Sequence, residues 1–411
     1  MTTTTPDVGS DLAGFRRAKW ATAALFCFLG FQYATWAARL PALKSRLDLG
    51  AGELGVLLMA CGVGAAVSFP LVTLLMRRLG ARLLSLLSAL CLVAVLLALS
   101  AVPNYPLALV VLAADGVAVG CLNVAMNAQG AALETAYGRT AMSQLHAVFS
   151  AGLLGAALLA SATTALTSSV PVHFAAASVL LLGLLAWAGR SLPTPGEPQR
   201  TEEPKPGGEP KPDEEPMPGE GPVRRARRWT VPSLLTLLMG CAMAFGTITE
   251  GAMNDWSTLY LKDVVKASPS VAPLGIAVVS VMMLLARLRA DRWRTRWGDA
   301  RVVRAGSALA GLGLAVSLAV GGVLPTLLGF ACVGLGAAAI TPCVYVAAAG
   351  QGSEALSLVA AMGTLGLLAG PALIGFVAGA GGLTLGMATV AASALVVTAA
   401  TTRIPWPRNP S

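Results

Sequence analysis

The chain has 411 residues, of which 55% are hydrophobic and 12% are charged, and its mean hydropathy is +0.71. A water-soluble protein of this length could not cover its surface with so few charges, so the composition excludes a soluble domain as the bulk of the chain and indicates that lipid is its main solvent. The net charge of +9 would suit nucleic acid, but the basic residues are distributed as membrane-topology signals, which excludes a nucleic-acid partner.

The predicted elements are apolar helices. The first apolar run starts near Lys19 and exceeds 20 residues, too long for a cleaved signal peptide, so we expect it to remain as the first helix. A membrane-spanning helix needs about 20 mostly apolar residues, and twelve such segments follow one another along the chain. The predicted spans are 19–41, 52–76, 83–102, 106–133, 140–167, 170–190, 231–261, 270–290, 302–322, 324–349, 355–380 and 382–402.

A proline-rich charged stretch divides the spans into two sets of six. Residues 191–228 hold ten of the 25 prolines and eight of the 20 acidic residues, a composition that cannot bury enough apolar surface to become ordered. We therefore predict an all-α membrane protein with twelve transmembrane helices in two six-helix bundles. Its predicted parts are a cytoplasmic tail (1–18), an N-terminal bundle (19–190), a disordered cytoplasmic linker (191–228), a C-terminal bundle (229–403) and a second cytoplasmic tail (404–411).

The placement of Lys and Arg predicts the orientation. If the N-terminus is cytoplasmic, 24 of the 29 basic residues lie on the cytoplasmic side. This matches the tendency of cytoplasmic loops to carry the excess of Lys and Arg. We therefore expect a multi-pass protein of the cytoplasmic membrane with both termini inside. The five basic residues left outside are Arg39, Lys44, Arg46, Lys262 and Lys266.

The two halves repeat each other weakly. Residues 78–82 read Arg-Leu-Gly-Ala-Arg, and residues 296–301 read Arg-Trp-Gly-Asp-Ala-Arg at the corresponding loop of the second half. The first span of each half also carries a tryptophan near its outer end, Trp36 and Trp256. These similarities between the halves predict a duplicated architecture, which many transporters use to build a central site.

These loops resemble the motif that the major facilitator superfamily carries between helices 2 and 3, with a copy between helices 8 and 9. The acidic residue expected before the first arginine is replaced by Arg77 in one copy and by Thr295 in the other, so the charge relay of that motif is altered here. The resemblance implies two six-helix bundles that transport a solute, with helices 1, 4, 7 and 10 lining the path.

Four further motifs resemble the YbjJ-like permease branch of this superfamily. They span both halves, and that branch often has Asp at the position of Asn123. The resemblance implies a transporter fold without naming a substrate. The motifs are W-x-x-R-L-P-x-L-K at 36–44, N-V-A-M-N-A-Q-G at 123–130, M-S-x-x-H at 142–146 and E-G-x-x-x-D-W-S at 250–257.

Three acidic residues lie within predicted spans and away from the span ends: Asp115, Glu250 and Asp255. A charge there costs about 2.5–3.5 kcal/mol on insertion scales, so it needs a partner, a water-filled cavity or a proton. We predict a proton-coupling or substrate-binding role for Glu250; the alternative is a carboxylate that only holds helices in register. Asp255 lies closer to the outer surface and is predicted to act in a gate, with an Arg39–Asp255 bridge between the bundles.

Other polar residues of the spans complete the candidate site. Asn123 and Asn127 are four residues apart and share a helix face, so they suit a hydroxylated or amide-bearing solute or, alternatively, bonds between helices. His146 has a side chain suited to proton transfer. His173, at the outer start of its span, receives no role. Further cavity candidates are Gln32, Tyr33 and Tyr345, and the further gate candidates are Trp36, Trp256 and an Arg287–Asp291 pair.

The seven cysteines stand singly in apolar runs, and no nucleotide-binding, metal-binding or nucleophile motif is present. We therefore expect no enzyme activity and no cofactor. The prediction is a monomeric, proton-coupled secondary transporter of a small neutral or weakly polar organic solute, in contact with membrane lipid, with export favoured over uptake. Proton-linked uptake of a sugar or metabolite and a non-transporting membrane sensor remain as alternatives.

Overall fold

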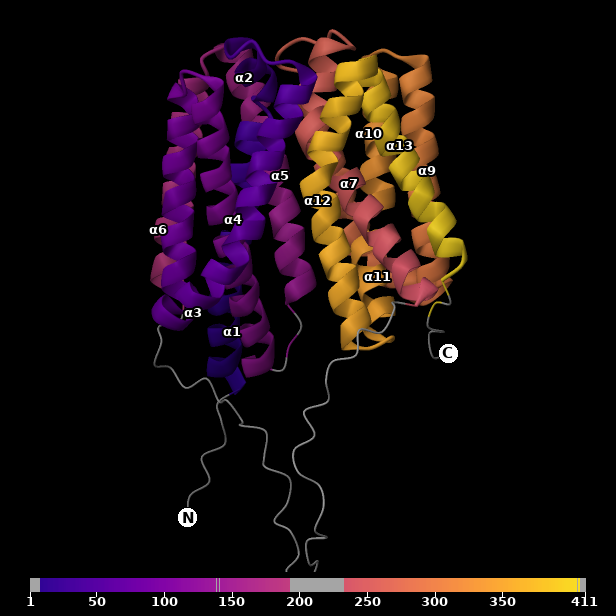
Figure 1. The fold of residues 1–411 in the computed structure, drawn as a ribbon. Helices are drawn as coiled ribbons and strands as arrows, with labels where there is room; N and C mark the ends of the chain where they lie inside the picture. Colours follow the sequence, from indigo (N-terminus) through magenta and orange to yellow (C-terminus); the bar gives the residue numbers. More distant parts are fainter. Residues whose placement is uncertain (1–7, 138, 140, 193–232, 405, 407–411) are drawn as a thin grey trace, which may run out of the picture.

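The structure is a computed structural model that describes residues 8–137, 139, 141–192, 233–404 and 406 (Figure 1). Almost all of the predicted linker (191–228) and of the predicted tail (404–411) lies outside these residues. The described chain is helical throughout, apart from short turns. Its helices are α1 (Val8–Ala37), α2 (Leu40–Arg46), α3 (Ala51–Ala101), α4 (Tyr105–Tyr137), α5 (Met142–Leu166), α6 (Val170–Ser191), α7 (Leu234–Asp263), α8 (Leu274–Trp297), α9 (Asp299–Val320), α10 (Val323–Ala337), α11 (Ile340–Ala349), α12 (Ser353–Gly381) and α13 (Leu383–Thr402).

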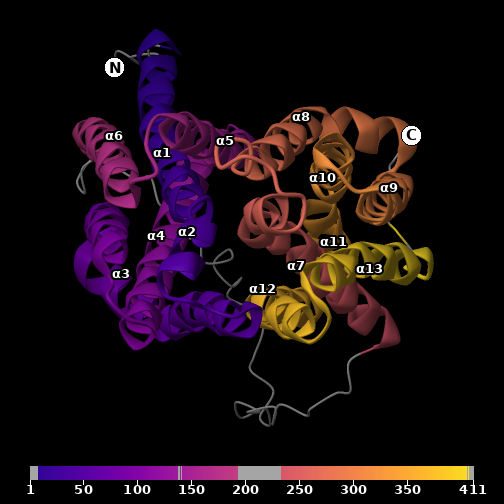
Figure 2. The same cartoon turned by 90° about the horizontal axis from the view of Figure 1, so that it is seen from above.

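The helices form two groups that stand side by side (Figures 1 and 2). Helices α1 to α6 make the N-terminal half, and α7 to α13 make the C-terminal half. The halves meet where α3 packs on α12 and where α5 packs on α8. We call the end at which α2 lies the α2 end, and the end at which α1 begins and α13 ends the terminal end (Figure 1).

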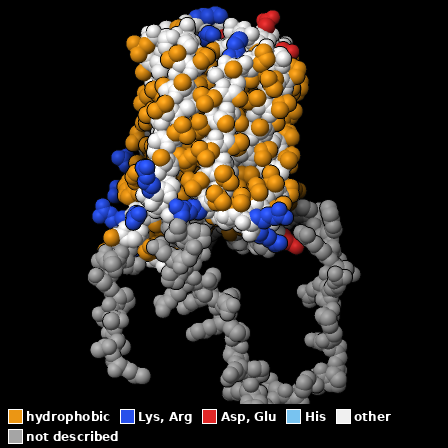
Figure 3. Space-filling view, turned by 90° about the vertical axis from the view of Figure 1, so that its left-hand side faces the viewer, with side chains coloured by type: hydrophobic (Ala, Val, Ile, Leu, Met, Phe, Trp, Pro, Cys, Tyr) orange, Lys and Arg blue, Asp and Glu red, His pale blue; other side chains and the backbone are white. Residues whose placement is uncertain are grey.

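An apolar belt surrounds the molecule between these ends. Ten helical stretches of the described chain are long and apolar enough to cross a membrane. Apolar side chains cover the middle of the face shown in Figure 3, whereas Lys and Arg gather at the ends, mainly at the terminal end. This distribution is that of a multi-pass membrane protein.

Two glycines shape corresponding turns of the two halves. Gly80 interrupts α3 with φ +73° and ψ 166°, and Gly298 separates α8 from α9 with φ +80° and ψ 152°. Positive φ is strained for residues with a Cβ, which explains glycine at the centre of both basic motifs. The two turns therefore share a backbone conformation as well as a sequence pattern.

The structure adds local features that hydrophobicity did not predict. The short helix α2 fills part of the loop expected between the first two spans, with Pro41 in its first turn. The span predicted at 324–349 is broken at residues 338–339 into α10 and α11. Helix α1 begins at Val8, before the predicted start of its span at Lys19.

The hydrophobic core is shared between the halves from the α2 end to about the middle of the helices. There, one cluster of buried side chains includes residues of both halves, such as Leu40, Leu54, Met253 and Trp256. Toward the terminal end, one cluster around Val344 belongs to the C-terminal half and another around Leu84 to the N-terminal half. The apolar contact that closes the molecule is therefore at the α2 end.

Small residues set the closest helix contacts. A Cβ on Gly116 of α4 would lie 1.8 Å from the carbonyl oxygen of Cys61, and one on Gly64 of α3 would lie 2.0 Å from that of Ala113. Between the halves, a Cβ on Gly55 of α3 would lie 2.9 Å from the carbonyl oxygen of Pro371. Close approach at small residues is typical of helix interfaces in membrane proteins.

We expect Gly116→Ala to destabilise the protein, because the added methyl group overlaps a backbone carbonyl that cannot move without separating α3 from α4. Overpacking of this kind costs about 1–3 kcal/mol. The thermal unfolding midpoint in detergent, followed by scanning fluorimetry, should fall for this variant. Gly183→Ala is the matched control, since nothing lies within 4 Å of the position of its Cβ. Equal midpoints for the two variants would contradict the packing described here.

Candidate functional site

The first candidate site is a buried polar cluster where α1, α3 and α4 meet. Asp115 of α4 is completely buried. The amide Nε2 of Gln32 donates a hydrogen bond of 2.8 Å to its Oδ1, and the thiol of Cys61 lies 3.7 Å from its Oδ2. Asp115 thus faces α1 and not the Asn123–Asn127 pair of its own helix, and both of its partners are uncharged.

Asp255 of α7 extends this cluster across the two halves. Its side chain is buried, and its Oδ1 accepts a hydrogen bond from the hydroxyl of Tyr33 on α1. Tyr33 packs edge-on against Trp36, with ring centroids 5.1 Å apart. Tyr33 and Cys61 each interact electrostatically with both Asp115 and Asp255. The two carboxyls therefore belong to one buried site at the junction of the halves.

The predicted Arg39–Asp255 bridge is wrong for this conformation. Arg39 is buried, and its Nε donates a 3.0 Å hydrogen bond to Nδ1 of His173 on α6, while its Nη2 lies 3.5 Å from the hydroxyl of Thr163 on α5. Because Nδ1 accepts, the histidine in this contact is neutral. Arg39 therefore connects helices of the N-terminal half. The Tyr33 hydroxyl, and not Arg39, is the partner of Asp255.

Other contacts close the α2 end between the halves. Nζ of Lys44 on α2 lies 2.6 Å from Oδ2 of Asp263 at the end of α7, and both side chains are partly buried. The hydroxyl of Ser161 on α5 donates to the carbonyl of Ser270, which precedes α8. These contacts supplement the apolar core that the halves share at this end.

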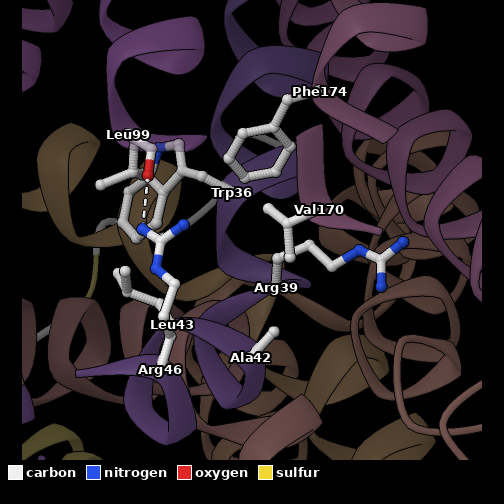
Figure 4. A pocket seen from close by; sticks show the side chains of 8 residues that line it. All are labelled: Trp36, Arg39, Ala42, Leu43, Arg46, Leu99, Val170 and Phe174. Atoms are coloured by element: carbon white, nitrogen blue, oxygen red, sulfur yellow. Dashed lines mark hydrogen bonds between the residues drawn. The ribbon is translucent and has the colours of Figure 1, made fainter. Parts of the chain in front are cut away.

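A small cavity at the α2 end shows how α2 is held (Figure 4). Arg39 and Arg46 both line it, and their guanidinium groups point away from each other. Arg46 Nη2 donates a 2.9 Å hydrogen bond to the carbonyl of Leu99, near the end of α3. Arg46 thereby fixes α2 to the N-terminal half, so that Lys44 is presented to Asp263.

The second candidate site is a charged contact near the middle of the helices. Arg287 of α8 donates a 3.0 Å hydrogen bond from Nη2 to Glu250 of α7 and a 2.8 Å hydrogen bond from Nη1 to the hydroxyl of Ser150 on α5. The ion pair belongs to the C-terminal half, and the serine belongs to the N-terminal half. We predicted that Arg287 pairs with Asp291; its guanidinium instead turns to Glu250, and the side chain of Asp291 lies outside the described residues.

The remaining predicted cavity residues lie toward the terminal end. His146, one turn before Ser150 on α5, is exposed and packs edge-on against Phe26 with ring centroids 5.2 Å apart. On α4 the Asn127 amide donates to the side-chain oxygen of Asn123 at 2.7 Å, and Asn123 is exposed. Tyr345 on α11 is 36% exposed. His146, Asn123 and Tyr345 thus present exposed polar side chains on this part of the molecule.

Trp36 and Trp256, counted with the gate from the sequence, are both almost fully buried, and both indole nitrogens lack a hydrogen-bond partner. They belong to the apolar core that both halves share at the α2 end. Among the described residues, no group of three or more His, Cys, Asp or Glu side chains is arranged to hold a metal ion. The polar side chains of the two sites can exchange protons or hydrogen-bond a solute.

Reasoning from the sequence missed four partners: Cys61, Ser150, His173 and Asp263. Small polar residues are common in membrane helices, so Cys61 and Ser150 carried no signal of their own. His173 could have been found, since a buried arginine near the outer end of one span needs an acceptor on another. Asp263 and Lys44 stand at helix ends, where water can solvate a charge, so the sequence offered no reason to look for a partner.

Two groups of apolar helices that meet around polar mid-depth contacts define a multi-pass membrane transporter. The sequence pattern of the Major Facilitator Superfamily matches residues 21–351. An uncharacterized MFS-type transporter of Yersinia pestis is 32% identical over 393 residues, which cover 92% of this chain and 95% of that protein. Membrane protein MosC of Rhizobium meliloti is 29% identical over 385 residues, covering 92% and 88%. The chain therefore belongs to the Major Facilitator Superfamily.

Solved structures share the fold. A mutant of the nucleoside transporter NupG superposes with a TM-score of 0.71 at 14% identity, over 95% of this chain and 99% of that one. A bacterial homolog to the human lysosomal transporter Spinster, in an inward-facing and occupied conformation, gives a TM-score of 0.68 at 11% identity, over 93% and 95%. Identities this low establish a common architecture and leave the solute open.

We expect the Lys44–Asp263 pair to hold the α2 end closed. Lys44→Asp replaces attraction by repulsion and should shift the protein toward a state open at this end, by about 1 kcal/mol or several-fold in population. The measurement is pulsed electron spin resonance between labels at two exposed positions, Leu107 on α4 and Leu324 on α10. Lys44→Asp should add a longer distance, and the charge swap with Asp263→Lys should remove it again. A distance distribution indifferent to all three charge patterns would rule out this role.

Proposed function

We propose that the protein is a secondary active transporter that moves a small, uncharged polar organic solute across the cytoplasmic membrane by alternating access. The terminal end faces the cytoplasm, because the excess of basic residues gathers there. The chain crosses the membrane twelve times: α3 supplies two spans, divided at Gly80, and α8 supplies one whose apolar character is reduced by the arginines of its final turns.

The observation that carries this proposal is the contact of Arg287 with both Glu250 and Ser150. It joins the halves by polar bonds near mid-depth, where side chains of α5, α7 and α8 meet. Burying charged and polar groups at this depth costs free energy, and an apolar contact would hold the halves together at lower cost. The polar contact is therefore better explained by a role in transport than by stability. A solute with hydroxyl or amide groups can replace the Arg287–Ser150 bond and so couple its binding to the separation of the halves.

The described conformation suits the cytoplasm-facing step of such a cycle. The halves share their apolar core at the α2 end, where Lys44 meets Asp263, whereas the core clusters toward the terminal end each belong to one half. The exposed polar residues Asn123, His146 and Tyr345 lie on the terminal side. We assign these residues, with Asn127, to the path by which the solute reaches the Arg287 contact.

We also propose that the chain belongs to the YbjJ-like branch. One of the four motifs that carry this resemblance supplies an acid of each candidate site, Asp255 and Glu250, and two others supply Asn123 and His146 of the proposed path. Motifs that supply an acid to each polar site support shared machinery more strongly than scattered identities do.

The test is solute entry into proteoliposomes. A mixture of uncharged polar metabolites is offered to vesicles that contain the wild-type chain and to empty vesicles, and the contents are identified by mass spectrometry. We expect at least one solute to enter faster with the protein present. Glu250→Gln should slow that entry about tenfold or more, since losing a charge-assisted hydrogen bond costs about 1.5–3 kcal/mol.

Glu354→Gln is the matched control for this experiment, because it makes the same chemical change at an exposed position at the start of α12. It should leave entry unchanged. If a folded wild-type chain admits no solute faster than empty vesicles do, or if the two variants behave alike, the proposed transport site is wrong.

A further inference from the structure

Asp115 and Asp255 are buried, and among the described residues neither has a cation as a contact. Asp115 is fully buried and Asp255 is 4% exposed, and the described contacts of both are with uncharged groups. Arg39, the cation that the sequence offered to Asp255, is instead engaged with His173 of α6. This separates the two aspartates from Glu250, whose carboxylate is held by Arg287.

Burying a carboxylate without a cation is expensive. An isolated ionised carboxyl loses far more solvation than hydrogen bonds to neutral groups restore, whereas the neutral acid is tolerated at much lower cost. Two such carboxyls, bonded to the adjacent residues Gln32 and Tyr33 of α1, would also repel each other if both were charged. The closed junction therefore favours aspartates that carry protons.

The partners of the two aspartates suit either charge state. The Tyr33 hydroxyl can donate to a carboxylate or accept from an acid, and a half turn of the Gln32 amide replaces its NH2 donor by its oxygen acceptor. In the described orientation the Gln32 oxygen is buried without a donor, so one unused acceptor already adjoins Asp115. By contrast, Arg287 brings a positive charge to Glu250 and can only donate. The two aspartates thus have neutral partners that suit either charge state, whereas Glu250 has a cation.

We propose that Asp115 and Asp255 form a proton-binding site at the junction of the halves, and that its protonation holds the α2 end closed. Each event forms one O–H bond on a carboxylate and removes one negative charge from the junction. Loss of the protons recharges the aspartates, and separation of α1 from α7 then admits the water that the charges require. This inference rests on the proposed function in one respect, since it makes protons the coupling ion of that transport.

The surroundings contain few competing groups. Tyr33 on α1 contacts Asp255, Cys61 on α3 contacts Asp115, and each lies within electrostatic reach of the other carboxyl. Cys91 of α3 also lies within electrostatic reach of Asp115. Helix α12, which packs on α3 and α7, carries Glu354 as its sole charged residue, at the terminal end. Lys44, the nearest basic residue of α2 to α7, is paired with Asp263. The charge of the junction is thus set by the two aspartates themselves.

Infrared spectroscopy of the full chain in lipid vesicles tests the site directly, because a protonated carboxyl has a C=O band that a carboxylate lacks. Between about pH 5 and about pH 9 we expect the wild type to lose this band as the aspartates release their protons. Asp115→Asn and Asp255→Asn should each remove one component, and Glu250→Gln should remove none. Tyr33→Phe, which keeps both acids, should shift the titration. A band unchanged in both aspartate variants would overturn the proposal.

The labels at Leu107 and Leu324 report the mechanical consequence. Raising the pH should lengthen their distance in the wild type and in Glu250→Gln, whereas Asp255→Asn, which is permanently neutral, should stay short at every pH. If Asp255→Asn follows the wild type, the proton site does not control closure. A titrating band with no solute entry would reject the proposed transport and leave the proton site standing; solute entry without the band would reject the proton site alone.

Discussion

Every ionised group inside the membrane must find compensation, and this constraint organises the structure. A charge near the bilayer centre costs a few kcal/mol unless it is paired, hydrated or neutralised. The chain meets the requirement in three ways. Glu250 has a cation, Arg287; Arg39 has a neutral imidazole and a hydroxyl; and Asp115 and Asp255 have only neutral partners. The partner of each group determines whether that group can change its charge or exchange its hydrogen bonds.

Helix packing places these compensated groups at different distances from the α2 end, along one junction between the halves. Glycines let α3 approach α4 and α12 closely, so the halves share an apolar core at the α2 end with little room for water. The aspartates lie at this dry junction, where charge is least tolerated. The Glu250–Arg287 pair borders this core near the middle of the helices, and the exposed Asn123 lies closer to the terminal end. Proton and solute are therefore assigned to separate contacts of the same pair of surfaces.

Much of this could be predicted from the sequence. Hydropathy and the position of the basic residues located the helices, and the three acids within spans identified the residues that form the two polar sites. The family resemblance gave the fold, which the comparisons confirm. The sequence could not give the pairing. Arg39 and Asp255 have opposite charges near the same predicted surface, yet Tyr33 of α1 contacts Asp255, and Arg39, in the turn between α1 and α2, contacts His173.

The same limit explains Arg287. Its spacing of four residues from Asp291 suggested a pair within one helix, which is a local rule. The tertiary contact with Glu250 depends on how α7 and α8 face each other, and no local pattern encodes that. Cys61 and Ser150 were missed for the same reason, since a small polar side chain becomes informative only when its neighbour on another helix is known.

The central claim is that the two ends of the molecule open in turn. It is tested most directly by measuring two distances in the same lipid vesicles, one between labels at Leu107 and Leu324 and one between labels at Ala136 and Gln351, exposed positions of the terminal end. The account predicts a reciprocal change: whatever lengthens the first distance shortens the second, in matching fractions. Distances that lengthen together, or a second distance that never responds to the first, would contradict it.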